Sequence, residues 1–134
     1  MLSHVVIGVG DFERAFAFYA SFMQALGLEQ RFCDRSRPWA GWHSAGGQRP
    51  LFVIAHPYDS QTHAPGNGQM VALMAGTRVT VRHAWEVGLE HGGRDEGAPG
   101  LRTHYHPHYY GAYLRDPDGN KLCVVCHEAE QDTD

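Results

Sequence analysis

Cysteine is scarce in this chain, and no apolar run is long enough to cross a membrane. Only Cys33, Cys123 and Cys126 occur among 134 residues. This odd and sparse set is unlike the disulfide framework of a small secreted domain. The N-terminal segment MLSHVVIGVG is apolar, but it is too short and too poor in charge for a signal peptide. We therefore expect a cytoplasmic protein without a membrane-spanning segment.

An excess of basic residues is also missing. The chain carries 11 Lys and Arg residues against 15 Asp and Glu, for a formal net charge of −4. A nucleic-acid-binding protein normally shows a basic surface, so this class is not expected. Hydrophobic residues make up 43% of the chain and charged residues 19%, as in an ordinary globular domain. We expect a single domain over residues 1–134 that binds neither nucleic acid nor membrane.

The chain contains two similar halves. The first begins with the β-rich run HVVIGVG, followed by Asp11 as a helix N-cap, a helical apolar repeat, and Gly27 as the residue that ends the helix. When His4 is laid on Met70, the second half repeats this order, with Thr77 in the place of Asp11. Such internal repetition outranks local secondary-structure signals.

Strand-like segments complete each half. The first helix is followed by the segments EQRFCDR, AGWHS and PLFVIAH. The second helix is followed by a loop rich in Gly, Pro and His, and then by YYGAYLRD and KLCVVCH. Each half therefore reads β-α-β-β-β, with a weak second strand in the second half. This order predicts an α+β fold of two modules, about 1–57 and 69–128, joined by a linker over 58–68. The acidic tail 128–134 is expected to fray.

The segment RDPDGN predicts a tight turn between the last two strands, because Pro, Gly, Asp and Asn are the residues that turns prefer. If the hairpin closes around Asp116–Asn120, Tyr113 lies opposite Cys123, and Tyr109 follows on the same face. A slip of one residue would place Tyr110 there instead.

Three segments of the chain resemble a known family. The chain is similar in its opening, middle and closing segments to the vicinal oxygen chelate superfamily. These segments are HVVIGVGDFERAFAFY, GNGQMVALMAGTRVTVRHAWEVGLEHGG and YYGAYLRDPDGNKLCVV. That superfamily includes glyoxalase I, bleomycin-resistance proteins and extradiol dioxygenases. The resemblance covers nearly the whole chain. It implies two βαβββ modules that form a cupped mixed sheet with the helices outside, and a homodimer. It leaves the activity open, because the family contains isomerases, dioxygenases, lyases and pure binders.

The resemblance also implies where a metal would lie. The family holds it with one strand residue near the start and one near the end of each module, which correspond here to His4, Phe52, Met70 and Cys123. Phe52 takes its place because FVIAH is laid on CVVCH. Phe52 has no lone pair, and the thioether of Met70 suits Zn(II), Mn(II) or Fe(II) poorly. Catalytic zinc needs three protein ligands. We therefore expect the metal site to be largely lost and no cofactor to be bound.

A rebuilt metal site is the alternative. The segment THYHPHYY alternates His104, His106 and His108, and two histidines at this spacing on a strand point to one face. If a divalent metal is bound, its expected ligands are His4, Cys123 and His106. The competing interpretation of these histidines is a polar loop over the mouth of the cup, interrupted by a proline.

Cys123 could be a metal ligand, a nucleophile or part of the cavity wall. We favour the wall, because no neighbouring motif lowers the pKa of the thiol and free cysteine is commonly buried. The C-x-x-C pair with Cys126 lies on a strand, whereas a redox pair normally begins a helix. Trp39 and Trp42 are further candidates for the pocket, with ordinary core packing as the alternative.

Three hypotheses about function follow. The first is a protein of this family that holds a small organic ligand in its cup without the standard metal. The second is a metal-dependent isomerase, lyase or dioxygenase with a rebuilt ligand set, and the third is an interaction module without a ligand. Whether the protein is an enzyme stays open. In the first hypothesis His4 can serve as donor or base, and the pocket is mostly apolar, lined by His4, Phe52, Met70, Cys123, Tyr109 and Tyr113.

Overall fold

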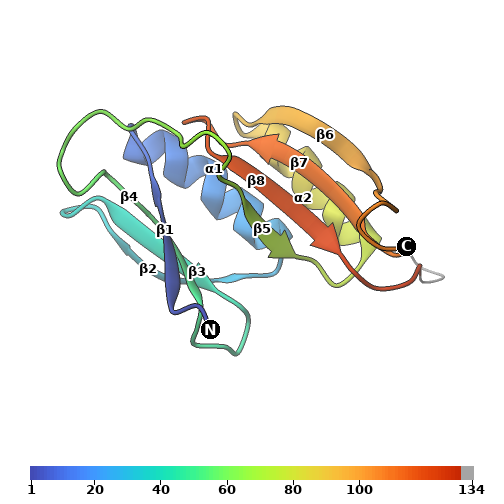
Figure 1. Cartoon of the computed structure of the whole chain (residues 1–134). Helices are drawn as coiled ribbons and strands as arrows, with labels where there is room; N and C mark the ends of the chain where they lie inside the picture. Colours follow the sequence, from blue (N-terminus) through green and yellow to red (C-terminus); the bar gives the residue numbers. More distant parts are fainter. Residues whose placement is uncertain (131–134) are drawn as a thin grey trace.

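A computed structural model describes residues 1–130, which form two modules of the same order (Figure 1). The elements of the first module are β1 (His4–Gly8), α1 (Phe12–Ala25), β2 (Glu29–Asp34), β3 (Trp39–His43) and β4 (Leu51–Ala55). Those of the second are β5 (Val71–Met74), α2 (Arg78–Glu90), β6 (Arg94–Leu101), β7 (Tyr110–Arg115) and β8 (Lys121–Cys126). The expected α+β fold is confirmed. The predicted fraying of the tail concerns mainly residues 131–134, which lie outside the described part.

Each module has its own four-stranded mixed sheet. The strand order is β1-β4-β3-β2 in the first and β5-β8-β7-β6 in the second. The first strand of each module pairs in parallel with the last one, and the remaining pairs are antiparallel. In both sheets the module's first strand is therefore an edge strand, and β1 and β5 border the space between the sheets.

Both helices begin and end where the sequence predicts. Asp11 accepts a hydrogen bond from the backbone N–H of Arg14, and Thr77 accepts one from the N–H of Thr80, so each side chain satisfies an N–H group that the first turn leaves free. After α1 the chain turns at Gly27, whose φ of +74° suits glycine. Within residues 1–130, neither helix is long and apolar enough to cross a bilayer.

Strand β6 is the weak second strand that the sequence predicts for the second half. Its sequence, RDEGAPGL, is poor in strand-forming residues, yet it pairs with β7 along the outer edge of the second sheet. The register shifts on either side of Gly97 show that the pairing is irregular. Proline and glycine are tolerated because an edge strand needs hydrogen bonds on one side only.

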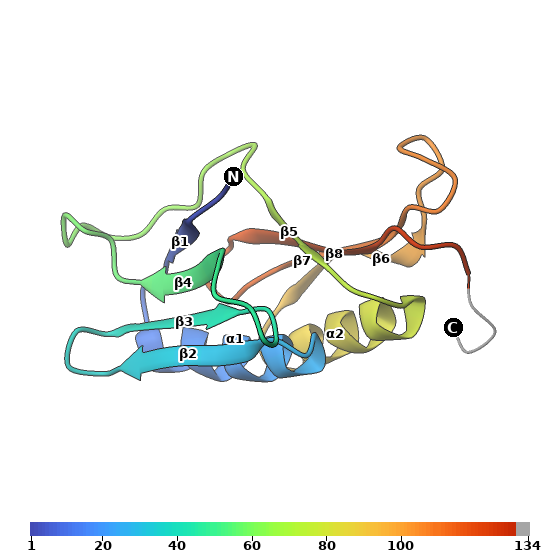
Figure 2. The same ribbon diagram turned by 90° about the horizontal axis from the view of Figure 1, so that it is seen from below.

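The core lies between the sheets and the two helices, which cover one side of both sheets (Figure 2). Phe18, Tyr19 and Phe22 of α1 are fully buried there, and Trp42 of β3 packs on Tyr19. On the other side, the linker and the loop before β7 extend beyond the strands (Figure 2). We call the sheet surface turned away from the helices the open face.

Candidate functional site

Alternation along the strands decides which side chains reach the open face. In β8, Leu122, Val124 and Cys126 belong to the core cluster beneath the sheet, whereas Cys123 and Val125 are buried outside that cluster. Cys123 therefore points to the open face.

The predicted register of the last hairpin is confirmed. Tyr113 pairs with Cys123, and the hydroxyl groups of Tyr113 and Tyr109 share a hydrogen bond of 2.9 Å. The Tyr109 hydroxyl also lies 3.5 Å from the Cys123 sulfur atom. The side chain of Tyr110 instead packs against the core. The open face thus brings together three of the predicted site residues.

Cys123 lies at the bottom of this group. It has no exposed surface, and burial raises the pKa of its thiol, although hydrogen bonds from Tyr109 and Tyr113 and the charges of Arg102 and Lys121 act in the opposite direction. Burial is also the main cause of the raised pKa of both tyrosine hydroxyls. All three groups therefore stay protonated at neutral pH, so Cys123 lacks the thiolate that a nucleophile needs.

His4 begins β1 and Met70 directly precedes β5, the two edge strands that border the space between the sheets. His4, at the start of β1, is exposed and its Nδ1 atom lies 2.8 Å from the hydroxyl of Ser3. Met70 precedes β5 and is 43% exposed. The next residues along the chain, Val5 and Val71, are half-buried and turn inward. This is expected, because they occupy corresponding positions in the two related modules.

Phe52 lies apart from this group and lines another cleft, of about 240 Å³, together with Trp42. Its ring lies 5.3 Å from the Tyr19 ring in the core, on the helix side of the sheet. The predicted alignment of β4 with β8 was wrong by one residue. When Asp11 is superposed on Thr77, Gly8 falls on Met74. Their partners on the last strands, Ala55 and Val125, therefore correspond to each other. Val53 is therefore the counterpart of Cys123. Because side chains alternate, a slip of one residue moves a side chain to the other face.

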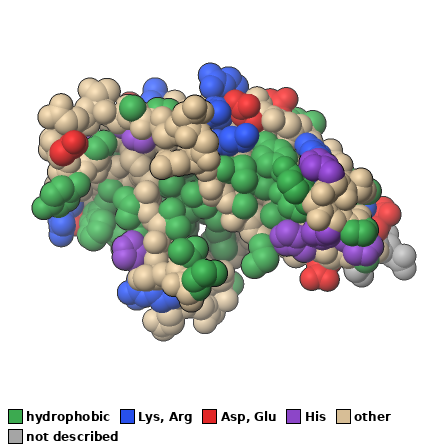
Figure 3. Space-filling model, viewed as in Figure 1, with side chains coloured by type: hydrophobic (Ala, Val, Ile, Leu, Met, Phe, Trp, Pro, Cys, Tyr) green, Lys and Arg blue, Asp and Glu red, His purple; other side chains and the backbone are tan. Residues whose placement is uncertain are grey.

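Histidines gather at the end of the open face where β8 ends (Figure 3). The Nε2 atom of His106 lies 2.8 Å from Nδ1 of His127, and their rings stack. Tyr109 packs edge-on against both rings. His104 instead packs on Tyr105, so the three histidines of the THYHPHYY segment do not act as one group.

Two adjoining clefts occupy the middle of the open face. One, of about 220 Å³, lies between β1 and β5 and is lined by Val5, Val6, Ile7, Pro65, Gly66, Gln69, Met70, Val71, Asn120 and Lys121. The other, of about 580 Å³, is lined by residues 65–70 of the linker together with Tyr105, Tyr113, Arg115 and Lys121. Of the predicted pocket residues, Met70 and Tyr113 line these clefts, whereas His4, Tyr109 and Cys123 line neither of them.

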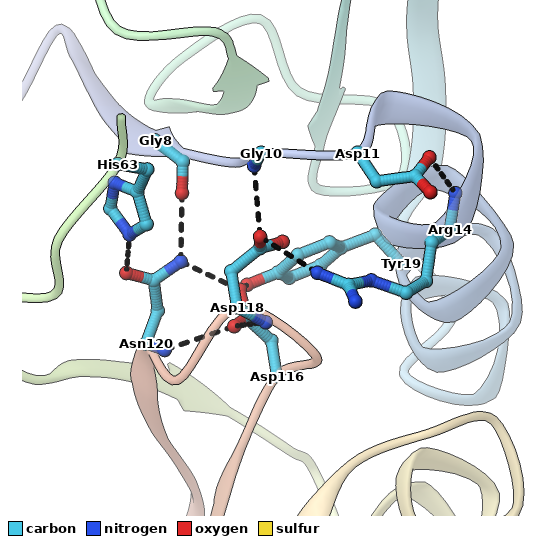
Figure 4. A network of polar contacts seen from close by, with 9 residues as sticks. All are labelled: Gly8, Gly10, Asp11, Arg14, Tyr19, His63, Asp116, Asp118 and Asn120. Carbon is cyan, nitrogen blue, oxygen red and sulfur yellow. Dashed lines mark hydrogen bonds and ion pairs between the residues drawn. The ribbon is translucent and has the colours of Figure 1, made fainter. Parts of the chain in front are cut away.

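A network of hydrogen bonds holds the linker and the two modules in place (Figure 4). Asn120, in the turn before β8, donates to the carbonyl of Gly8 in β1, and its Oδ1 atom accepts from Nε2 of His63 in the linker. Asp116 accepts a 2.6 Å bond from the buried hydroxyl of Tyr19. Burial and the negative charge of Asp116 raise the pKa of this hydroxyl well above its usual value. The DPDGN turn thus fixes the walls of the clefts.

The residues at the family's metal positions do not fit a divalent ion. Val53, like Phe52, has no donor atom, and Met70 offers only a thioether, so at most His4 and the buried Cys123 remain, fewer than the three protein ligands that catalytic zinc needs. This leaves His4 as the one nitrogen ligand. Within residues 1–130, no three His, Cys, Asp or Glu side chains are arranged to hold a metal, so His4, Cys123 and His106 do not form such a group.

Sequence reasoning missed several residues that line the clefts. Lys121, Tyr105 and residues 65–69 were not among the candidates, whereas Met70 was. Lys121 could have been found, because it lies two residues before Cys123 and hence on the same face of β8. The linker gave no such signal, since its position depends on the contact between His63 and Asn120.

Comparison with known proteins agrees with this fold. A sequence model of the Glyoxalase/Bleomycin resistance protein/Dioxygenase superfamily matches residues 1–124. The chain is similar to the crystal structure of a glyoxalase/bleomycin resistance protein from Albidiferax ferrireducens T118, with 33% identity, a TM-score of 0.83, and coverage of 94% of this chain and 98% of that one.

Two further structures share the fold at lower identity. A glyoxalase-related enzyme from Fulvimarina pelagi is 18% identical, with a TM-score of 0.69 over 94% of this chain and 87% of that one. A glyoxalase/bleomycin resistance protein/dioxygenase family enzyme from Burkholderia phytofirmans PsJN is 20% identical, with a TM-score of 0.68 over 94% and 98%. A search of curated proteins finds no match.

Proposed function

Since the chain belongs to the glyoxalase/bleomycin resistance protein/dioxygenase superfamily, we propose that it holds a small organic ligand on its open face, with the superfamily's metal site largely lost. One observation carries this proposal. The clefts are open and lined by aromatic, apolar and cationic side chains, while the positions that would hold the metal offer a single nitrogen ligand.

The dimensions and lining of the clefts support a small ligand. Ligand pockets typically measure about 300–1,000 Å³ and combine apolar walls with a few polar groups, and the larger cleft, at about 580 Å³, falls in that range. The rings of Tyr105 and Tyr113 offer flat surfaces for stacking. Met70 contributes a flexible side chain that can adapt to different shapes.

A screen of small organic molecules by ligand-observed NMR tests the proposal. The screen is run with a chelator present, so that binding without metal is measured. Met70→Trp fills the cleft, whereas Val79→Trp places the same ring on α2, at a side chain that is also 43% exposed. We expect bound molecules to lose affinity at least about tenfold in Met70→Trp and to be unaffected by Val79→Trp. Binding that needs an added divalent ion, or that Met70→Trp leaves unchanged, contradicts the proposal.

A second candidate function is a metal-dependent isomerase, lyase or dioxygenase with a rebuilt ligand set. The observation that favours it is the pair of imidazole nitrogens of His106 and His127, which are 2.8 Å apart. Imidazole is a common ligand of transition metals. This function requires near-stoichiometric metal in the wild type and its loss in His127→Ala. His83→Ala, on α2, is the matched histidine control.

We also propose that the protein forms a homodimer through the edges of β1 and β5. Large apolar side chains on and next to these strands are unusually exposed: Leu2 by 59%, Val6 by 57% and Met74 by 77%. Hydrophobic side chains are prominent over the middle of this face (Figure 3), and such patches commonly mark interfaces. Light scattering should give the mass of a dimer for the wild type and of a monomer for Met74→Lys. Val79→Lys is the control, and a monomeric wild type contradicts the proposal.

A further inference from the structure

The chain has a single lysine, and it lies at the junction of the clefts. All other basic side chains apart from histidine are arginines, at ten positions of the sequence. Lys121 lines the apolar cleft between β1 and β5, the larger cleft beside the linker, and a third cleft of about 270 Å³ next to β6. A molecule in any of these spaces lies within reach of its ammonium group.

The spaces on either side of Lys121 differ in character. Toward β1 and β5 the walls are mainly apolar, with Val6, Met70 and Val71 among the lining residues. Toward β6 and β7 the walls carry the rings of Tyr105 and Tyr113 and the basic side chain of Arg102. The open face therefore offers an apolar region and a cationic region that meet at Lys121.

The cationic region has more positive than negative charge. Arg102 donates hydrogen bonds to the carbonyls of Ala98, Gly100 and Gly111. Arg115 pairs with Glu96 at 2.6 Å, and this contact is the main reason that the pKa of the Glu96 carboxyl is lowered. The one acid among these residues is thus already engaged, although the chain as a whole has a formal charge of −4.

Within the described part of the chain, no side chain forms a hydrogen bond or an ion pair with the ammonium group of Lys121, although its charge contributes to the lowered pKa of the Glu96 carboxyl. The ammonium group lies 5.6 Å from the centre of the Tyr113 ring, and the Arg102 guanidinium lies 5.5 Å from the same ring. Both charges are therefore attracted to one ring. A bound anion would neutralise the positive field that they create in the cleft.

From this arrangement we propose that the ligand of the open face is an organic monoanion, with a carboxylate at Lys121 and an apolar body that extends toward Met70 and β1. This inference rests on the proposed function and specifies its ligand class. The single ammonium group suits one negative charge. The neighbouring apolar walls suit a short aliphatic or aromatic body.

Matched pairs of molecules that differ only in charge test this inference. Phenylacetate is compared with phenylacetamide, and hexanoate with hexanamide, by NMR titration of protein that carries isotope-labelled lysine. Because the chain has one lysine, the side-chain signal reports on Lys121 without further assignment. We expect each carboxylate to bind about tenfold more tightly than its amide and to shift the lysine signal. The preference should weaken at high salt.

The variants separate the charge from the cleft. Lys121→Met keeps the length of the side chain and removes its charge, so it should abolish the preference for the carboxylate, and acid and amide should then bind equally. Arg31→Met, which removes an exposed charge on β2, should keep the preference.

Two results would overturn the inference. Equal binding of acid and amide to the wild type, with the lysine signal unmoved, refutes the anionic ligand but leaves the proposed function in place. Failure of all four molecules to bind at millimolar concentration contradicts the inference and the proposed function together.

Discussion

Removing the hydroxyl group of Tyr19 should destabilise the protein measurably. Tyr19 has no exposed surface, Asp116 is 3% exposed, and the hydroxyl donates a 2.6 Å hydrogen bond to the carboxylate. A hydrogen bond to a charged group contributes about 1.5–3 kcal/mol. In Tyr19→Phe the carboxylate keeps its bonds from Asp118 and Asn120, and the removed atom leaves little space. We therefore expect a loss of about 2 kcal/mol in the free energy of unfolding.

Urea unfolding followed by tryptophan fluorescence measures this loss. At a slope of about 2 kcal/mol per molar urea, the midpoint should fall by about 1 M with the slope unchanged. Tyr58→Phe is the control, because the Tyr58 ring is fully exposed, and its effect should stay within about 0.5 kcal/mol. All proteins are compared at one concentration, since dimerisation would shift the apparent stability.

A double-mutant cycle locates the effect. Asp116→Asn should cost more than Tyr19→Phe, because the amide NH2 replaces one carboxylate oxygen and then faces donors. These are the Tyr19 hydroxyl and the Asn120 amide on one side, or the backbone N–H groups of Asp118 and Asn120 on the other. The two changes together should cost less than their sum, since they remove the same contact. A loss below about 0.5 kcal/mol in Tyr19→Phe, or full additivity, would show that this bond does not hold the DPDGN turn against α1.

Three further predictions follow from the same contacts. Because the pKa of Tyr19 is raised in the folded state, the stability advantage of the wild type over Tyr19→Phe should be full below about pH 10 and decline above it. Urea titrations of both proteins below and above about pH 10 would show this decline. Iodoacetamide at mildly alkaline pH should modify the partly exposed Cys33 before the buried Cys123 and Cys126, as peptide mass spectrometry can follow; early modification of Cys123 contradicts its buried, protonated state. Asp11→Ala should lower the free energy of unfolding by about 1 kcal/mol through loss of the α1 cap, whereas Asp59→Ala, in the linker, should change it little.

Local patterns in the sequence predicted the modules well because their causes are local. A capping side chain and a following glycine depend on nearby residues, so the bounds of α1 could be inferred from Asp11 and Gly27. The last hairpin was equally predictable, because its short turn fixes which residues face each other, including Tyr113 and Cys123.

The features that were predicted weakly or wrongly depend on contacts between distant segments. Strand β6, expected only as a weak strand, forms because β7 offers it a partner, although its own composition favours a loop. Phe52 was assigned to the wrong face because apolar residues occupy both faces of β4, so the sequence does not reveal the alternation. Likewise, the wall of the cleft next to Lys121 depends on the linker, which the contact between His63 and Asn120 helps to hold against the second module.

Metal content is the measurement that tests the proposed function most directly. Untagged protein is incubated with Zn(II), Ni(II), Mn(II) or Fe(II), desalted and subjected to elemental analysis, with His4→Ala and His127→Ala in parallel. If the metal site has been lost, as we propose, the wild type retains far less than one ion per chain and neither variant differs from it. Retention of close to one ion per chain, abolished by either variant, would contradict the proposal and identify a metal-dependent member of the superfamily.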